Sequence, residues 1–378
     1  MSTGTAYRSA PSTVGPYTVL TRFDADVPGI PLPEERFVAR SPDGAHTVLV
    51  SVPLPGADPE RFRVEAEASR YLLGQWVSPA THVSGPGELP WHARPYLPAL
   101  PLPTALALHG GPLPEHTVRA LGACLAETVA IAHGQGLSHA GISPGAVLLA
   151  HDGPRLACFG AVRAAAPDGE SRSGLPGLES GSLPPEQAAG GRPRPQGDIY
   201  ALGATMAYAA TGHTVPEREE LPESLRGIVT ACLARDPATR PHAADLIREF
   251  TEPVGPPGAA LAAPVAEVDS TPGNSAGVTP APGWLPGRLT AAVARQSADV
   301  LAAEIDATET APPVPTTEPP RTPAPAAYPG HPPAPPTPAD GGGQLPGASG
   351  AFESAPPMPS TPPPTPPSAP PAAPHLPK

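Results

Sequence analysis

Two residue types are almost missing from this chain of 378 residues. The only lysine is Lys378, the last residue, and the only asparagine is Asn274. Everything before Asn274 therefore lacks both residue types. No site in that region can rely on a lysine amine or on an asparagine amide, however the sequence is aligned with another protein.

Long apolar runs and paired cysteines are also lacking. The chain has no run of 18 or more apolar residues that could span a membrane, and its first 15 residues have no apolar stretch typical of a signal peptide. Cys124, Cys158 and Cys232 form no CxxC pair, and their odd number suits no closed set of disulfides. Such thiols are typical of core residues in a reducing compartment, so we expect a cytoplasmic protein.

The charge and the proline content divide the chain further. A formal net charge of −12 argues against nucleic acid or an anionic membrane as the main partner. Roughly half of the 64 prolines follow Glu252, where apolar residues are few, and a segment of that kind buries too little surface to offset the entropy of ordering. The predicted organisation is a folded domain (17–250), a Pro/Ala-rich linker (251–286), an isolated amphipathic helix (287–306) and a disordered Pro-rich tail (307–378).

Local patterns predict a strand-rich part followed by a helical part. Runs of β-branched and aromatic residues predict strands, and apolar residues at helical spacing predict helices. This order favours an α+β fold with two lobes, 17–97 and 104–250. The expected strands are 17–23, 36–40 and 47–52, and the expected helices are 61–73, 115–134, 198–211, 225–233 and 243–250.

Two alternatives remain open for each of the C-terminal segments. The helix at 287–306 either docks on its own domain or binds a partner. The proline runs of the tail favour polyproline II, which suits either a protein that reads such segments or a semi-stiff spacer.

One segment has the pattern of a known motif. The sequence HAGISPGAVLL, from His139 to Leu149, resembles the catalytic loop of serine/threonine protein kinases, whose pattern is H-R-D-L-K-P-x-N-V-L-L. Further motifs of that family follow in the right order and spacing over residues 17–250. They are Cys158-Phe159-Gly160 for D-F-G, Pro184-Pro185-Glu186 for A-P-E, Asp198-Ile199-Tyr200 at the start of the central helix, and Asp236-Pro237 with Arg240-Pro241. The resemblance implies a two-lobed protein-kinase-like fold.

The same alignment shows that the residues of phosphoryl transfer are replaced. The family's phosphate-binding lysine aligns with Ser51, its base with Gly141, and the lysine two positions further on with Ser143. Its two metal-binding residues, asparagine and aspartate, align with Ala146 and Cys158. Removing one electrostatic stabiliser of a transition state costs about 10²–10³ in rate, so these replacements together should abolish transfer.

The family's phosphate-binding glycine loop is replaced as well. Between Tyr17 and Phe37 the only glycine is Gly29, which is flanked by prolines that have no N–H group to offer a phosphate.

Residues that the family uses to hold the fold together are retained. The resemblance implies that Glu65 (or Glu67) is the glutamate of the helix that follows the lysine strand. It implies a structural His139 whose ring hydrogen-bonds to backbone, an Asp198 that holds the catalytic-loop backbone, and a buried pair of Glu186 with Arg240. Phe159 and Gly160 keep two of the three D-F-G positions.

We therefore expect a catalytically inactive pseudokinase of bacterial type that acts as a regulator or scaffold. Its expected partners are proteins, among them an active kinase, and no cofactor or metal is expected. One alternative is a divergent serine/threonine protein kinase that binds ATP and Mg²⁺ and retains some transfer. Another is a nucleotide-binding switch without transfer, with the adenine in an apolar slot near Trp91 to Leu97.

Overall fold

A computed structural model describes residues 11–24, 29–252, 265–267 and 277–310. These residues belong to one compact unit that ends at Pro313. The described part of the chain includes only residues 307–310 of the tail expected at 307–378, as the end of a helix, and less than half of the linker expected at 251–286.

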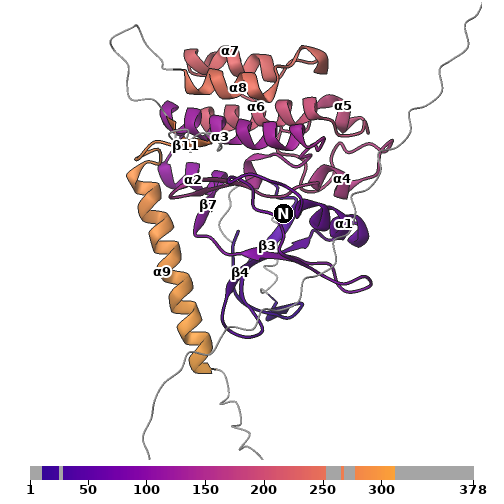
Figure 1. Cartoon of the computed structure of the whole chain (residues 1–378), viewed down its shortest axis with the longest axis vertical. Coiled ribbons are helices and arrows are strands. Elements are labelled where there is room, and N and C mark those ends of the chain that lie inside the picture. Colours follow the sequence, from indigo (N-terminus) through magenta and orange to yellow (C-terminus); the bar gives the residue numbers. More distant parts are fainter. Residues whose placement is uncertain (1–10, 25–28, 253–264, 268–276, 311–378) are drawn as a thin grey trace, which may run out of the picture. The chain divides into compact units, whose positions relative to one another are not determined.

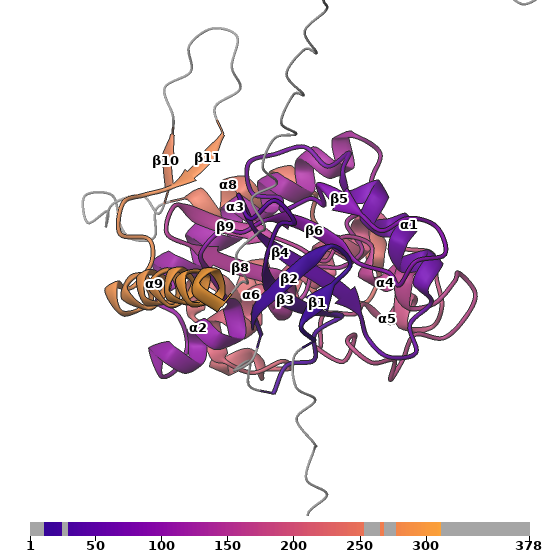
Figure 2. The same ribbon diagram turned by 90° about the horizontal axis from the view of Figure 1, so that it is seen from below.

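The N-terminal lobe is built on a six-stranded antiparallel sheet with the strand order β1-β2-β3-β4-β6-β5 (Figure 2). A hairpin joins β3 to β4: Gly44 adopts a positive φ and donates its N–H to Ser41 O, which closes the turn. The strands are β1 (Thr13–Val14), β2 (Tyr17–Arg22), β3 (Glu34–Arg40), β4 (Thr47–Pro53), β5 (His82–Val83) and β6 (His92–Pro95).

Helix α1 (Pro59–Ser69) follows β4 and packs against α4 (Ala161–Ala165), which opens the activation segment (161–183) after Cys158-Phe159-Gly160 (Figure 1). It begins two residues before the expected start at 61, because Asp58 accepts a hydrogen bond from Arg61 N and Pro59 occupies the first turn. It ends four residues earlier than expected. The Ser69 hydroxyl binds Ala66 O and Ala80 N, which fixes the chain at the point where it leaves the helix.

The C-terminal lobe is helical, with a small three-stranded sheet, β7-β8-β9, between it and the N-terminal lobe. Helix α6 is buried along almost its whole length, as its apolar sequence predicts. The elements are α2 (Leu102–His109), α3 (Glu115–Gly134), α4 (Ala161–Ala165), α5 (Pro185–Ala188), α6 (Pro195–Thr211), α7 (Glu223–Cys232), α8 (Ala243–Thr251), β7 (Ala99–Pro101), β8 (Val147–Ala150) and β9 (Gly153–Leu156), with 3-10 turns at Pro144–Ala146, Arg218–Glu220 and Pro237–Thr239.

A C-terminal extension completes the domain. It contains β10 (Val265–Glu267), β11 (Val278–Pro280) and α9 (Gly287–Thr310). Trp284, just before α9, is buried: its indole N–H donates to His151 O over 3.1 Å, and its own carbonyl accepts from the Thr117 hydroxyl over 2.6 Å.

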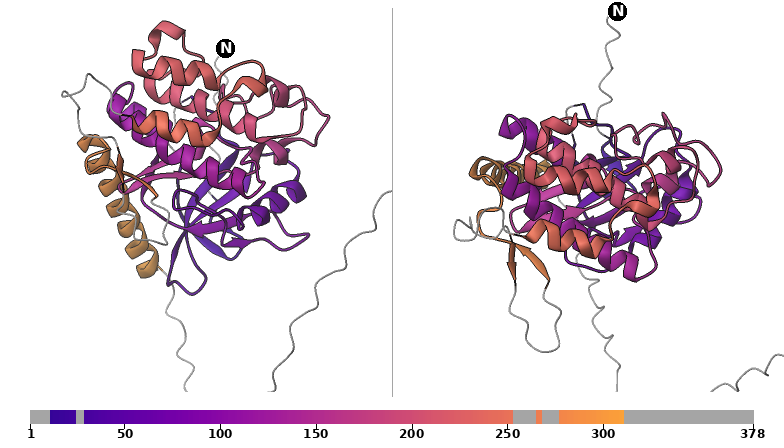
Figure 3. Two further views of the ribbon diagram at one scale, coloured as in Figure 1. Left: turned by 45° about the horizontal axis from the view of Figure 1, so that its top comes forward. Right: turned by 90° about the horizontal axis from the view of Figure 1, so that it is seen from above.

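Helix α9 contacts both lobes (Figures 1 and 3). It packs against α2 and β7 on the C-terminal side and against β2 on the N-terminal side, and its buried face includes Leu289, Val293 and Val300. Gln296 Oε1 accepts a hydrogen bond from Ala99 N in the connection between the lobes, and Glu304 contacts the Thr47 hydroxyl at the start of β4. The helix predicted for this region therefore lies against its own domain.

The two-lobed α+β architecture predicted from the sequence is confirmed. Within the ranges given above, none of the helices has the length and apolar character needed to cross a membrane.

Candidate functional site

The side of the sheet that faces the C-terminal lobe is unusually polar. Side chains alternate between the two faces of a strand, so the apolar residues Phe37, Ala39, Val48, Val50 and Trp91 gather in a separate cluster on the outer face. The alternate residues point to the inner face. Five of them are polar, Glu34, Arg36, Ser51, His92 and Arg94, and all five are buried, beside the apolar Val38 and Leu49.

This alternation corrects one expectation. Trp91 does not line a slot between the lobes, because its ring packs edge-on against Tyr17 in the outer cluster, with the centroids 5.3 Å apart.

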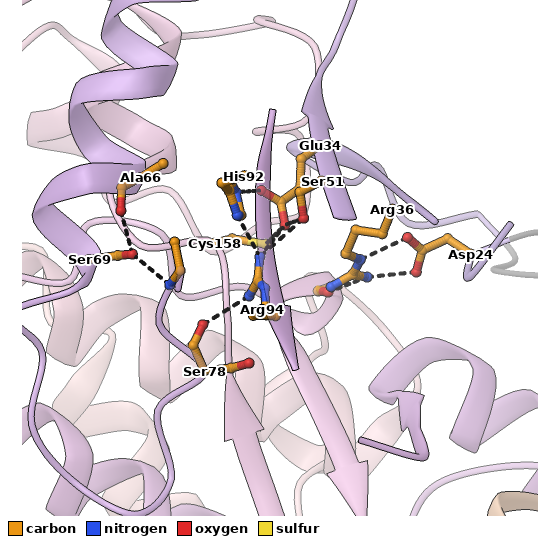
Figure 4. Close-up of polar contacts among 12 residues, drawn as sticks. Asp24, Glu34, Arg36, Ser51, Ala66, Ser69, Ser78, His92, Arg94 and Cys158 are labelled. Carbon is orange, nitrogen blue, oxygen red and sulfur yellow. Dashed lines mark hydrogen bonds and ion pairs between the residues drawn. The ribbon is translucent and has the colours of Figure 1, made fainter. Parts of the chain in front are cut away.

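Glu34 is the centre of a buried hydrogen-bond network (Figure 4). Its Oε1 accepts from Ser51 Oγ at 2.9 Å, from Arg94 NH2 at 3.2 Å and from Cys158 Sγ at 3.5 Å. Its Oε2 lies 3.2 Å from His92 Nε2. Two of the replaced positions, Ser51 and Cys158, therefore meet on one carboxylate that sequence reasoning did not single out.

The charges in this network are balanced within it. Burial alone would raise the pKa of Glu34, but the contacts with His92 and Arg94 outweigh it and hold that pKa well below its usual range. Burial lowers the pKa of His92, so we assign it the neutral form with the proton on Nε2, donated to Glu34. Glu34 and Arg94 then form a buried ion pair, and burial together with Glu34 raises the pKa of the Cys158 thiol, which stays protonated.

Besides the contact of Glu34 with Cys158, two side chains of the N-terminal lobe reach the catalytic-loop segment. Arg36, on β3, forms two hydrogen bonds of 2.7 Å with Asp24 and donates to Gly145 O at 3.0 Å, so a side chain of the sheet reaches the segment that precedes β8. Leu32, in the connection between β2 and β3, also lies on Gly145: a Cβ added to that glycine would be 2.4 Å from Leu32 Cδ2. The connection that aligns with the family's phosphate loop thus packs on the catalytic-loop segment.

The position of the family's base is occupied by backbone. A Cβ added to Gly141 would lie 1.8 Å from Cys158 O and 2.9 Å from Cys158 C, closer than real Cβ atoms approach such atoms. Cys158 itself has a φ of 59°, a conformation rare for a residue with a side chain. The backbone around these residues therefore leaves no room for any side chain at position 141. The other two replaced positions, Ser143 and Ala146, are both buried.

Glu65 has a partner other than the one that the resemblance implies. Its carboxylate forms hydrogen bonds of 2.9 and 2.8 Å with Arg163 Nε, in α4. The alternative residue, Glu67, pairs with Arg70 on the surface instead. Gly160 lies directly beneath Glu65, because a Cβ there would be 2.1 Å from Glu65 Oε2.

Two retained groups of residues tie the C-terminal lobe together. Asp198, at the start of α6, accepts from His139 N at 2.7 Å and from Ala140 N at 2.8 Å. Arg240 and Glu186 form a two-pronged pair with distances of 2.6 and 3.0 Å, in which the Arg240 side chain is fully buried. These contacts hold the 139–146 segment and helix α5 on the helical core.

His139 differs from expectation in one respect. Its ring packs edge-on against Phe159 with the centroids 5.4 Å apart, but neither ring nitrogen has a hydrogen-bond partner in the part of the chain that the structure describes. Burial lowers the pKa of this ring to about 4, although Asp198 opposes the shift. The ring is therefore neutral near pH 7.

The buried ring predicts a pH-dependent stability. Between pH 6.5 and 4 the unfolded chain binds a proton at position 139 and the folded protein does not, so stability is complete above pH 6.5 and falls as the pH drops towards 4. The loss is about 3 kcal/mol for a shift from the ordinary value of about 6.5 to about 4. His139→Phe should remove that part of the profile, as urea unfolding at pH 7 and pH 4 will measure.

A control is available at an exposed histidine. His151, whose side chain is 71% exposed, should give an unchanged profile when it is replaced by glutamine. If His139→Phe leaves the difference between the two pH values unchanged, the buried neutral ring is not its source.

The sequence held a signal for the missed residues. Glu34 with Arg36, and His92 with Arg94, are polar residues at spacing two inside strands, which puts each pair on one face. Cross-strand register then places Arg36, Ser51 and His92 in one row.

Across the described segments, no three His, Cys, Asp or Glu side chains are arranged to hold a metal ion.

The similarities to known proteins agree with the fold. No protein-family model matches the sequence. It is 32% identical over 263 residues to the probable serine/threonine-protein kinase PkwA of Thermomonospora curvata, a match that covers 64% of this chain and 34% of that protein. It is 31% identical over 261 residues to the serine/threonine-protein kinase AfsK of Streptomyces coelicolor, covering 62% and 32%. It is 32% identical over 258 residues to AfsK of Streptomyces griseus, a match that covers 62% of this chain and 31% of that protein.

The fold and the motifs thus define a protein-kinase-like protein. Within that class, the similarity to these three bacterial serine/threonine protein kinases supports a kinase-like family for the chain. It spans about a third of the length of these three relatives.

Proposed function

We propose that this protein is a catalytically inactive member of its family, a pseudokinase that acts through protein partners as a regulator or scaffold. The observation that supports this most strongly is the buried Glu34 carboxylate. It lies against Ser51 and Cys158, which align with the two charged residues that hold phosphate and metal in the family. A fixed negative charge there repels a triphosphate, and its balancing cation, Arg94, is already paired with it.

The residues present do not fit Mg²⁺ and ATP. A protonated, buried thiol at position 158 is a poor ligand for Mg²⁺, which prefers hard oxygen donors. Position 141 has no room for a carboxylate, and Leu32 and Arg36 contact Gly145 in the segment that aligns with the catalytic loop. We therefore derive no catalytic step through the nucleotide.

The retained contacts support a role for the folded domain itself. Asp198 and the Glu186–Arg240 pair maintain the shape of the C-terminal lobe, although no chemistry depends on them in this proposal. A domain of this shape offers protein partners, including an active kinase, a kinase-like surface. The three buried free cysteines support a place in the reducing cytoplasm. A polyproline reader for the tail stays a hypothesis, since 311–378 lie outside the described residues.

Calorimetric titration of Mg·ATP into the full-length protein tests the proposal. We expect no binding heat at millimolar nucleotide and no transfer of labelled phosphate to the protein itself or to a generic substrate. An active serine/threonine kinase in the same buffer is the positive control. Binding without transfer would favour a nucleotide-dependent switch. Transfer that Cys158→Ala abolishes would show a divergent active kinase, and either result would overturn the proposal.

A further inference from the structure

A cavity of about 230 Å³ lies between helix α1, the sheet and the activation segment. Protein interiors rarely contain voids larger than a water molecule, whose share of liquid volume is about 30 Å³. This cavity is several times that size and approaches the lower end, about 300 Å³, of the range typical of small-molecule sites. It is separate from the space that Arg36 and Leu32 close, because neither of these residues lines it.

The walls of the cavity are mainly apolar and come from three parts of the chain. Helix α1 contributes Phe62 and Ala66, the end of β9 contributes Leu156, and the activation segment contributes Leu175 and Leu178. Pro55, Gly56 and Pro176 lie at its edge and are exposed, which gives a small molecule a way in from solvent. An apolar ligand would therefore contact α1 and the activation segment together.

The polar groups in the wall limit the chemistry of the ligand. Two carboxylates, Glu34 and Glu65, line the cavity with one guanidinium, Arg94. Among the described residues, Glu34 Oε2 accepts one hydrogen bond, from His92, whereas Glu34 Oε1 accepts three. Because a carboxylate oxygen can accept two hydrogen bonds, Oε2 has capacity for one more donor. Both carboxylates are already paired, Glu34 with Arg94 and Glu65 with Arg163, so the wall offers an anion no unpaired cation.

We propose that this cavity is a binding site for a compact apolar small molecule whose polar head donates a hydrogen bond, such as a hydroxyl or an amine. The apolar body lies between Phe62, Leu156 and Leu178, and the head faces the Glu34 carboxylate. Glu34 and Cys158 line this cavity, so it adjoins the cleft described above. The naphthol titration and the Mg·ATP titration have separate readouts, so each can succeed or fail without the other.

The probe for this site is 2-naphthol, with naphthalene-2-carboxylate as its matched control. Both have the same fused rings, but only the naphthol donates a hydrogen bond, and the carboxylate is an anion at pH 7. Titration of the full-length protein by calorimetry should show saturable binding of the naphthol and at least tenfold weaker binding of the carboxylate. Equal affinities, or no binding of the naphthol, would overturn the proposal.

Two variants locate the binding. Ala66→Phe places a ring in the cavity and should abolish naphthol binding, whereas Ala68→Phe, on the same helix but outside the lining, should leave the affinity within twofold of wild type. Leu178→Trp fills the cavity from the opposite wall, and it replaces Ala66→Phe if that variant does not fold. Wild-type affinity in a folded cavity-filling variant would show that the probe binds elsewhere, which contradicts the proposal.

Discussion

Replacing Glu34 by glutamine is expected to lower the free energy of unfolding by about 3–5 kcal/mol. The amide removes the negative charge that balances Arg94, whose side chain is only 3% exposed, and so leaves a buried cation without its counter-ion. It also weakens the contacts with Ser51 and His92, because an amide has one accepting oxygen where the carboxylate has two. Guanidinium-induced unfolding followed by tryptophan fluorescence measures the change.

The neighbouring residue on the same strand is the matched control. Glu35 pairs with Arg22 at the surface, where its side chain is 35% exposed, and Glu35→Gln should change stability by less than about 1 kcal/mol. A Glu34→Gln variant as stable as Glu35→Gln would show that the folded protein does not need the Glu34 charge to balance Arg94. The main physical support for an inactive cleft would then be lost.

The part of the site that could be predicted is the part that depends on residue type and spacing. The motif around His139 fixes which residues take the positions of the family's base and metal ligands, and a glycine or an alanine cannot act as either. The same spacing placed Asp198 at the start of the central helix, where its carboxylate faces the backbone N–H groups of His139 and Ala140.

The network around Glu34 could not be derived in the same way. Its members are separated by up to 124 residues, from Glu34 to Cys158, so no local pattern shows that they meet. The pairing depends on strand register and on the closed arrangement of the two lobes, which local patterns do not specify. Alternation puts Glu34 and Arg94 on the inner face, but only the folded chain shows that they meet.

The surface on which the C-terminal extension packs could not be predicted from the sequence either. Spacing of apolar residues predicted a helix at 287–306, and the structure has one at Gly287–Thr310. An apolar stripe says that a helix needs a partner surface but not which surface that is. Trp284 fixes the path of the chain before the helix begins. Because this residue is buried beside Thr117 and His151, α9 starts at the junction of the lobes and runs along it.

Gly141→Ala should destabilise the protein by about 3 kcal/mol or more, which is at the upper end for the insertion of one methyl group. The new Cβ would lie 1.8 Å from Cys158 O, and because both groups belong to the backbone, neither can move aside by rotating a side chain. Relief requires the activation segment to shift from the 139–146 segment. Gly160 N, which donates to His139 O at 2.9 Å, would lose its partner in that shift. Urea unfolding monitored by circular dichroism measures the loss.

The same substitution at a second glycine should have the opposite sign. Gly227 lies in the middle of α7 with no atom within 4 Å of an added Cβ, so Gly227→Ala should stabilise the protein by up to about 1 kcal/mol. A carboxylate at position 141 is larger still, and Gly141→Asp should therefore yield a less stable protein without phosphoryl transfer, even when it is combined with Cys158→Asp. If Gly141→Ala unfolds at the same urea concentration as wild type, the activation segment can move at little cost. The loss of the family's base would then follow from the residue type at position 141 alone. The backbone would not exclude a larger side chain at that position.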